Sequence, residues 1–435
     1  MTTAAPTSQS ERIVALDILR GIAILGILLM NIPGFSLSGV VGNNPATLNE
    51  FGTVNYYIWY VVAWFFDGTQ RALFSMLFGA GIVLFISRQE KKSNGLEPAD
   101  YFFRRQLWLI MFSLFDVYVL LWNGDILMDY AVYGMMMFVF RNQSPKMLII
   151  AACISILFMT TRENLVYSKQ KQMVKKGEAA AAIDTTLTKL TAAQKKDLEE
   201  FTSFKKRLEP ASRLKRMQDE HEKVRGNYES VYEYRTGKYI ENIVEYTYFS
   251  LWDVLTCMLL GMAFLKLGIL TGNASTKVYA WMCIGGLGIG LVLSYIQIQY
   301  RINNQFDWLA YTRQVHFSFY EPARILRSVG ILGLIMLLYK SNWFNGIFSV
   351  LRPVGQMAFT NYLMQSLICS IIFNGFALSL YGQLQRYEVY LVVLSIWTFQ
   401  IIFCNIWMRY FLYGPFEWAW RSLTYWKRQN FIRAA

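Results

Sequence analysis

Residues 15–32 read ALDILRGIAILGILLMNI, an apolar run that nevertheless contains Asp17, Arg20 and Asn31. The run has the length of a transmembrane helix, because a bilayer core of about 30 Å requires roughly 20 predominantly apolar residues. Similar runs recur along the whole chain, and only 16% of its 435 residues are charged, whereas a soluble domain has about 25%. The sequence therefore predicts an all-α polytopic integral membrane protein.

Ten transmembrane helices of this kind are predicted. They cover roughly residues 13–32, 69–87, 104–122, 126–140, 145–160, 248–269, 278–299, 323–339, 354–376 and 387–409. The aromatic run 55–66 is too short to span a bilayer and is assigned to the membrane interface. If the N-terminus lies in the cytoplasm, every short loop on the cytoplasmic side carries Lys or Arg, and so does the C-terminal tail. This orientation therefore satisfies the positive-inside rule. These loops account for the net charge of +13, so no nucleic-acid partner is expected.

The chain divides into five regions. These are a disordered N-terminus (1–12), N-terminal transmembrane helices (13–160), a hydrophilic insertion (161–247), C-terminal transmembrane helices (248–409) and a basic cytoplasmic tail (410–435). The insertion is rich in Lys, Glu, Ala and Gln, which predicts helical segments, interrupted at Pro210. It is expected outside the cytoplasm, because long loops translocate largely regardless of charge. It could be a lid, a surface that docks a partner, or a solvated elaboration without chemistry, and few contacts with the bundle are expected.

Cysteine and glycine patterns indicate no cofactor site. The five cysteines all lie in apolar runs and have no metal-ligand spacing, so neither disulfides nor a metal site is expected. The glycine-containing runs 77–82 and 283–290 lack the lysine of a phosphate-binding loop. Small residues in apolar helices allow two helix backbones to approach closely, and we interpret both runs as packing surfaces.

The polar residues of the first helix share one face. Asp17, Arg20, Ile24, Ile27 and Asn31 follow one another at intervals of three or four residues. This spacing places Asp17, Arg20 and Asn31 on one stripe of a helix. Ionisable groups at membrane depth cost several kcal/mol unless they are paired or hydrated, so the stripe should face the bundle interior. Asp17 and Arg20 can pair with each other. Such a pair could lock the packing of the helix, but intramembrane charges are functional by default.

Further polar residues gather near other predicted helix ends. Residues that could contact a substrate, or simply form hydrogen bonds between helices, are Asp67, Arg71, Asp129, Tyr130, Asn361 and Gln365. Asp125 suits the first turn of a helix, where a carboxylate is favoured by the helix dipole, whereas Asp116 lies deeper and has no evident partner. His316, in an outer loop, is the candidate if a histidine base is needed. The candidate bases are thus Asp116, Asp125 and His316.

Three motifs resemble the YeiB family of bacterial membrane proteins, whose conserved domain has no assigned function. They are RIVALDILRGIAILGILLMNI, GQMAFTNYLMQSLICSIIFNGFALSLYGQLQ and FLYGPFEWAWRSLTYWKRQ. The resemblance extends over nearly all of the chain except the insertion. It implies a multi-pass protein of the bacterial cytoplasmic membrane.

The first motif also resembles a wider superfamily of membrane acyltransferases, which includes bacterial cell-surface O-acyltransferases and heparan-alpha-glucosaminide N-acetyltransferase. Their first helix has a similar Asp-x-x-Arg pattern, here Asp17 and Arg20. The O-acyltransferases have a histidine where this chain has Asn31, whereas the glucosaminide enzyme is similar to this chain in having asparagine. A histidine base in the first helix is therefore excluded here.

The expected function is acyl transfer from cytosolic acyl-CoA to a glycan or another hydroxyl or amine compound on the outer face. Arg20 would bind the phosphate of the donor or polarise the acyl carbonyl, Asp17 would orient Arg20, and Asn31 would donate a hydrogen bond near the reaction centre. Apart from acyl-CoA as co-substrate and the surrounding lipids, no tightly bound cofactor is expected. A transporter or flippase of a small or lipid-linked solute is the alternative, and a non-enzymatic scaffold is a third. A tunnel that reaches Arg20 from the cytoplasm would favour the acyltransferase. A vestibule that opens alternately to the two sides would favour the transporter, and the absence of any cavity would favour the scaffold.

Overall fold

The computed structural model describes residues 12–93, 95–184 and 186–433, which form seventeen α-helices and no β-sheet. The one β-bridge in these ranges joins Phe411 to Ile432. The predicted all-α class is thus confirmed. The predicted disordered segment, residues 1–12, lies outside the described residues except for its last position.

Within the described ranges, six helical segments are long and apolar enough to cross a membrane. They are α1 (Val14–Ser36), Val54–Glu90, α7 (Pro145–Ala181), α11 (Thr276–Asn303), α13 (Tyr320–Ser341) and α16 (Arg386–Tyr410). Val54–Glu90 joins α3 (Val54–Val61), a π-helical turn (Val62–Phe66) and α4 (Thr69–Glu90). A seventh span is present if α10 (Tyr228–Lys266), which bends by 75° between Glu245 and Ser250, is counted. The chain is therefore a multi-pass membrane protein.

Four of the ten predicted spans are not among these six segments. Residues 104–122 overlap α5 (Glu97–Tyr118), which contains more charged residues than a membrane-spanning helix of this kind. Residues 126–140 and 354–376 correspond to short helices, Leu127–Phe140 and α15 (Ala358–Phe373). At 1.5 Å per residue these are roughly 21 and 24 Å long, less than a bilayer core of about 30 Å. Residues 248–269 form the second half of the bent α10.

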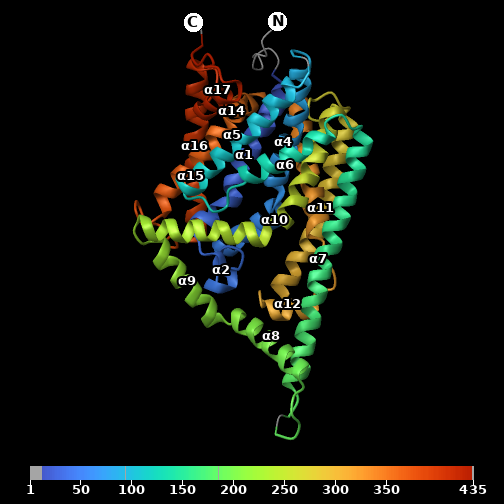
Figure 1. The fold of residues 1–435 in the computed structure, drawn as a ribbon, viewed down its shortest axis with the longest axis vertical. Helices are drawn as coiled ribbons and strands as arrows, with labels where there is room; N and C mark the ends of the chain where they lie inside the picture. Colours follow the sequence, from blue (N-terminus) through green and yellow to red (C-terminus); the bar gives the residue numbers. More distant parts are fainter. Residues whose placement is uncertain (1–11, 94, 185, 434–435) are drawn as a thin grey trace.

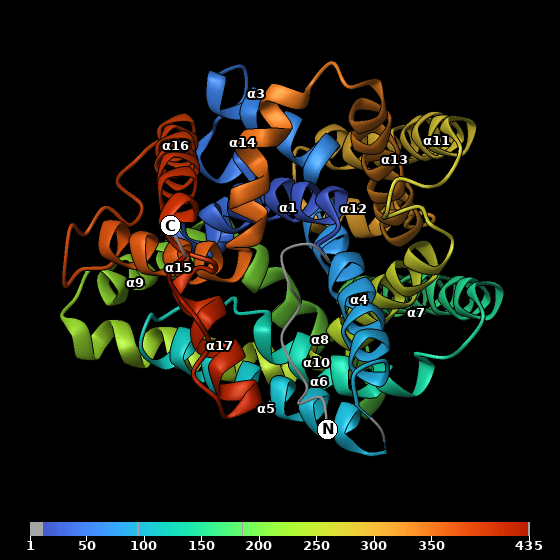
Figure 2. The same ribbon diagram turned by 90° about the horizontal axis from the view of Figure 1, so that it is seen from above.

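The start of α1 and helix α17 (Pro415–Tyr425) lie at one end of the bundle, here called the terminal end, and the insertion lies at the other (Figure 1). Seen from the terminal end, α1 runs near the centre of the molecule, while α7 and α11 lie at its periphery (Figure 2). Helix α1 contacts α4, α15, α16 and α14 (Asn345–Gln356). The first helix is therefore surrounded by other helices, which gives its polar residues an interior environment.

The glycine runs pack helices together, as predicted. A Cβ atom added to Gly286 of α11 would lie 2.6 Å from the backbone nitrogen of Gly330 in α13. A Cβ added to Gly79 of α4 would lie 2.3 Å from the carbonyl oxygen of Met258 in α10. No side chain fits in these spaces, so the two helix pairs are in direct backbone contact.

The insertion forms an arch. Helix α7 continues well beyond residue 160, α8 (Ala192–Leu208) turns back, and α9 (Pro210–Val224) begins at Pro210, where the interruption is predicted. The first half of α10 then lies across the end of the bundle (Figure 1). Short helices α2 (Gly39–Gly42) and α12 (Trp308–Gln314) lie near this end, and α17 (Pro415–Tyr425) lies at the terminal end.

The expectation of few contacts between insertion and bundle is wrong. Val224 and Tyr239 are buried, and Gly375 N donates a 2.8 Å hydrogen bond to the Val224 carbonyl. Arg235 is also buried, and its guanidinium donates to the carbonyls of Gly34 and Phe35 at the end of α1. Apolar and polar contacts therefore fix the later part of the insertion to the bundle. Hydrophilic composition did not reveal these contacts, because only a few of the residues are buried.

Candidate functional site

The terminal end of the bundle contains a cavity of about 220 Å³, here called the arginine cavity. Its walls come from α1, α4, α5, α6 (Leu127–Met137), α15 and α17, together with the end of α14. Five arginines line it, Arg12, Arg20, Arg88, Arg105 and Arg421. The two carboxylates in the lining are Asp17 and Glu417.

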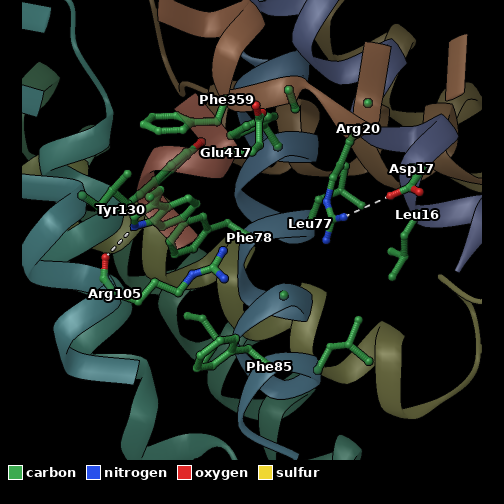
Figure 3. Close-up of a pocket in the computed structure, with 18 of the residues that line it drawn as sticks. Leu16, Asp17, Arg20, Leu77, Phe78, Phe85, Arg105, Tyr130, Phe359 and Glu417 are labelled. Atoms are coloured by element: carbon green, nitrogen blue, oxygen red, sulfur yellow. Dashed lines mark hydrogen bonds and ion pairs between the residues drawn. The ribbon is translucent and has the colours of Figure 1, made fainter. Parts of the chain in front are cut away.

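Aromatic rings contact at least two of the five arginine side chains. Arg105 lies 3.9 Å from the centroid of the Trp420 ring, and the Trp420 indole donates a 2.9 Å hydrogen bond to the Arg105 carbonyl. Arg421 lies over the Tyr413 ring at 4.6 Å. Figure 3 shows Arg20 and Arg105 extending into the same space from opposite sides. Because arginines outnumber carboxylates here, the cavity favours an anionic ligand.

The predicted contact between Asp17 and Arg20 is confirmed. An Arg20 nitrogen lies 3.3 Å from Asp17 Oδ1, and Gln356 Nε2 donates to Asp17 Oδ2 at 3.2 Å. The Arg20 side chain is 32% exposed and that of Asp17 is 7% exposed. Asp17 therefore contacts Arg20 on the side away from the cavity, while the guanidinium faces the cavity (Figure 3).

A close approach of α14 to α1 brings Gln356 to this pair. A Cβ atom on Gly355 would lie 1.7 Å from the Asp17 carbonyl oxygen, so only glycine allows the contact. The wall between Asp17 and Gln356 depends on this one residue.

Glu417 caps helix α15. Its Oε1 accepts from the backbone nitrogens of Phe359 (2.7 Å) and Thr360 (3.0 Å), and its Oε2 accepts from the Thr360 hydroxyl. Burial raises the pKa of Glu417, because the carboxylate is removed from water. Since Glu417 already occupies the N-terminus of α15, an anionic ligand must rely on the arginines instead.

Apolar and aromatic side chains form the deeper walls of the arginine cavity. They include Phe74, Phe78, Leu109, Leu127, Tyr130 and Tyr362. The Tyr130 hydroxyl lies 2.9 Å from Ser75 Oγ. The Tyr362 hydroxyl accepts from the Ile126 nitrogen and donates to Asp125 Oδ1, both at 3.2 Å. The cavity thus combines a cationic part with an apolar part, which suits a ligand that is anionic at one end and apolar at the other.

Two carboxyl groups lie directly behind Tyr362. Asp125 accepts hydrogen bonds from the Ser113 hydroxyl and from the backbone nitrogens of Leu127 (3.1 Å) and Met128 (3.2 Å). Asp116 is fully buried and interacts electrostatically with Asp125. The hydrogen-bonding neighbours of Asp116 are Ser366 and Asp125. Because two carboxyl groups are buried side by side here, this pair is a candidate for proton transfer.

A second polar cluster surrounds Arg71 at the other end of α4. Arg71 and the fully buried Arg324 of α13 both form ion pairs with Asp253 of α10, and Arg324 also pairs with Glu321 at 2.6 Å. The Arg71 side chain nevertheless remains 44% exposed. The predicted candidate Asp129 accepts a hydrogen bond from Ser250. The structure therefore gives Arg71 a partner from a distant helix.

The remaining predicted residues lie elsewhere. Asn361 donates to Val354 O (3.0 Å) and to Cys404 Sγ (3.2 Å), and Gln365 donates to Ile24 O (3.2 Å) and Gln400 Oε1 (3.0 Å). These contacts favour the packing interpretation for both amides. Of the twelve predicted candidates, only Asp17, Arg20 and Tyr130 line the arginine cavity. The other nine do not, and they include the half-buried Asn31, the exposed His316, and Asp67.

Several site residues were not predicted as such. From the sequence, Arg105 and Arg421 are interpreted only as indicators of topology, and Arg12 is given no role. Arg324 and Asp253 fall inside the predicted spans 323–339 and 248–269, and the cost of burying a charge in a membrane could have identified them. No sequence signal points to Tyr362, whose role depends on its contact with Asp125.

Comparison with known proteins gives relatives without an assigned activity. Residues 264–427 match the family model described as "Protein of unknown function (DUF418)". The chain is 29% identical to "Uncharacterized protein YxaH" of Bacillus subtilis, over 98% of this chain and 97% of that protein. It is 25% identical to "Uncharacterized protein YeiB" of Escherichia coli, over 95% and 96% respectively. No solved structure matches. These findings support distant homology over nearly the full length.

Proposed function

We propose that this protein is a membrane acyltransferase that accepts an acyl group from a CoA thioester and passes it to a hydroxyl or amine compound. The observation that carries the proposal is the arginine cavity. Its five arginines suit the phosphates of the donor, and its apolar walls suit the acyl group. The resemblance of the Asp17–Arg20 motif to the first helix of membrane acyltransferases supports the same reaction class.

The size of the cavity limits how the donor binds. A volume of about 220 Å³ is below the roughly 300–1,000 Å³ of most ligand pockets. Only the acyl thioester end of the donor therefore enters, and the nucleotide stays at the mouth. In this arrangement Arg12 and Arg421 contact phosphate, while Arg20 reaches the thioester.

The chemical step follows from the residues around the cavity. The acceptor oxygen or nitrogen attacks the thioester carbonyl carbon, and its proton passes through the Tyr362 hydroxyl, which lines the cavity, to the Asp116–Asp125 pair. Arg20 stabilises the negative charge that develops on the carbonyl oxygen, and Asp17 positions Arg20. The carbon–sulfur bond then breaks, the thiolate takes up the proton, and an ester or amide and free CoA thiol are the products.

The proposed orientation places both termini and the arginine cavity on the cytosolic side of a bacterial cytoplasmic membrane. The distribution of Lys and Arg among the short loops supports this orientation, and a cytosolic mouth gives access to cytosolic acyl-CoA. The insertion is then extracytoplasmic. Ten membrane-embedded helices, three of them too short to cross alone, are the arrangement that fits this orientation.

The test is a titration of the purified, folded protein with acetyl-CoA and longer acyl-CoAs. A charge-assisted hydrogen bond contributes about 1.5–3 kcal/mol, so Arg20→Ala should weaken binding by roughly 10- to 150-fold. Arg20→Lys should not restore it, because a lysine ammonium lacks the planar guanidinium that contacts Asp17 and the thioester oxygen at the same time. The matched control is Arg409→Ala, an exposed arginine at the end of α16 that does not line the cavity. Absence of saturable binding to any acyl-CoA would contradict the proposal.

A transporter of a lipid-linked or small anionic solute is the second candidate. The observation in its favour is a continuation of polar groups from the arginine cavity toward the insertion. Beyond Asp125 and Asp116, Arg235 hydrogen-bonds Asn123 (3.1 Å) and Asn374 (3.3 Å). Buried charges of this kind also mark translocation paths. A transporter would not depend on the thioester, so binding of acyl-CoA and of CoA with equal affinity would favour this candidate. A scaffold without ligand would need no such cavity.

A further inference from the structure

A second cavity, of about 480 Å³, lies at the opposite end of the molecule, between the insertion and the bundle. We call it the insertion vestibule. Residues of α9 line one side, and Arg301 with the segment 306–311 lines the other. Asp67 and Tyr320 of the bundle and residues at α2 complete its walls. Its volume lies within the range of ordinary ligand pockets, roughly 300–1,000 Å³.

The charged groups of the insertion vestibule favour an anion. Its lining contains the three arginines Arg213, Arg216 and Arg301, and the two carboxylates Asp67 and Asp307. Asp307 is engaged in capping α12, because its Oδ1 accepts from the nitrogens of Leu309 (2.8 Å) and Ala310 (3.3 Å). The net charge of the lining groups that can still pair with a ligand is therefore positive.

Arg301 is the arginine best placed for a ligand. It comes from the last turn of α11, and its buried Nε has no hydrogen-bond partner in the part of the chain that the structure describes. Glu163 of α7 interacts with it electrostatically; Glu163 Oε1 accepts a 2.8 Å hydrogen bond from Ser318 Oγ, and its Oε2 has no hydrogen-bond partner among the described residues. Because neither Arg301 nor Glu163 is fully paired, the Arg301 guanidinium can pair with an anion that enters the cavity.

Aromatic rings provide the other half of the surface. Trp308 and Tyr311 stack with ring centroids 4.9 Å apart, and Phe306 and Tyr320 also line the cavity. Tyr311 is 1% exposed, and its hydroxyl interacts with Tyr167 and Gln297. Aromatic faces with polar tips suit a ligand that has both an apolar face and hydroxyl groups.

We propose that the insertion vestibule binds a saccharide that carries a phosphate or carboxylate group. The anionic group pairs with Arg301 and Arg213, since guanidinium groups bind both anions through two parallel hydrogen bonds, and the sugar ring lies against Trp308. The binding at this site goes beyond the proposed acyl transfer and does not depend on it.

This inference gives the insertion a function. Helix α9 begins at Pro210 and supplies Arg213 and Arg216, so the arch closes the vestibule over the end of the bundle. An adjoining cavity of about 360 Å³ shares Arg213, Phe306 and Asp307 with it, which leaves room for a ligand longer than one sugar.

The experiment measures binding of glucose 1-phosphate and glucuronate to the purified full-length protein by calorimetry, with neutral glucose as the comparison. Saturable binding of either anion, at least tenfold tighter than that of glucose, is expected. Arg301→Gln and Arg213→Gln should each weaken it at least tenfold, and Trp308→Ala should weaken it as well. Lys215→Gln is the matched control, because it removes the same charge from an exposed position on α9 outside the lining, and it should leave binding unchanged.

The outcomes separate the inference from its alternatives. If neither anion binds, if glucose binds equally well, or if Lys215→Gln has the same effect as Arg301→Gln, the inference is wrong. Competition by nanodiscs containing phosphatidylglycerol, but not by phosphatidylcholine nanodiscs, would overturn the saccharide assignment and identify an anionic lipid headgroup as the ligand. Failure of competition would support a soluble ligand. Acyl-CoA titration of the same protein tests the arginine cavity separately, so either site can fail without the other.

Discussion

Arg235 should hold the first half of α10 against the bundle. It is 3% exposed, and its two terminal nitrogens donate four hydrogen bonds of 3.0–3.3 Å. The acceptors are the carbonyls of Gly34 and Phe35 and the side-chain oxygens of Asn123 and Asn374. Two of these acceptors are carbonyls near the end of α1, which have no partner within the helix.

The expected cost of removing these contacts can be worked from their number and burial. Each hydrogen bond to a charged group contributes about 1.5–3 kcal/mol, but neighbouring contacts are not additive. Removal of one partner from a buried charged network typically costs about 3–5 kcal/mol. If the segment opens locally, amide exchange should accelerate by a factor of roughly 100 to a few thousand, since each 1.4 kcal/mol is tenfold.

The assay is hydrogen–deuterium exchange of Arg235→Met in detergent, followed in peptides that cover 228–245. Methionine keeps an unbranched side chain of similar length, so loss of hydrogen bonds dominates over loss of packing. The matched control is Lys238→Met in the same segment, which removes only a partly exposed pair with Glu241 worth about 0–1 kcal/mol. Exchange in Arg235→Met that is no faster than in this control would refute the reasoning.

Two other predictions concern His221 and Gly355. Burial, with a smaller effect from Arg225 and against an opposing effect of Glu220, lowers the pKa of His221, whose ring lies edge-on to Tyr381 at 5.6 Å. The neutral form of His221 is therefore favoured while residues 221–226 contact the loop at Tyr381. This contact should weaken as the pH falls below the ordinary histidine pKa of about 6.5. Exchange corrected for its intrinsic pH dependence should rise between about pH 7.5 and 5.5, and His221→Phe should abolish that rise; an unchanged rise would contradict the assignment. Gly355→Ala should lower the melting temperature and weaken acyl-CoA binding, because overpacking costs about 1–3 kcal/mol. Gly346→Ala, on the same helix with open space around its Cβ, should do neither, and equal effects of the two variants would argue against the close contact.

Local patterns predicted the parts of the structure that depend on neighbouring residues. The apolar runs indicated a helical multi-pass protein, and Pro210 marked the start of α9. Residues three apart lie on one face of a helix, so the Asp17–Arg20 contact followed from the sequence. The number of spans was less predictable, because tilting, bending and burial within the bundle allow helices such as α15 to be shorter than the bilayer.

Only the tertiary structure assembled the candidate sites. The arginine cavity joins Arg12, Arg105 and Arg421 from α5, α17 and the residues before α1, and Tyr362 reaches Asp125 across 237 positions of sequence. The insertion vestibule likewise joins α9 to Arg301. Sequence patterns are periodic along one helix and determine which face of that helix is apolar. Which faces of different helices meet is decided by the packing of all of them together, and it is this packing that brings distant charges into one cavity.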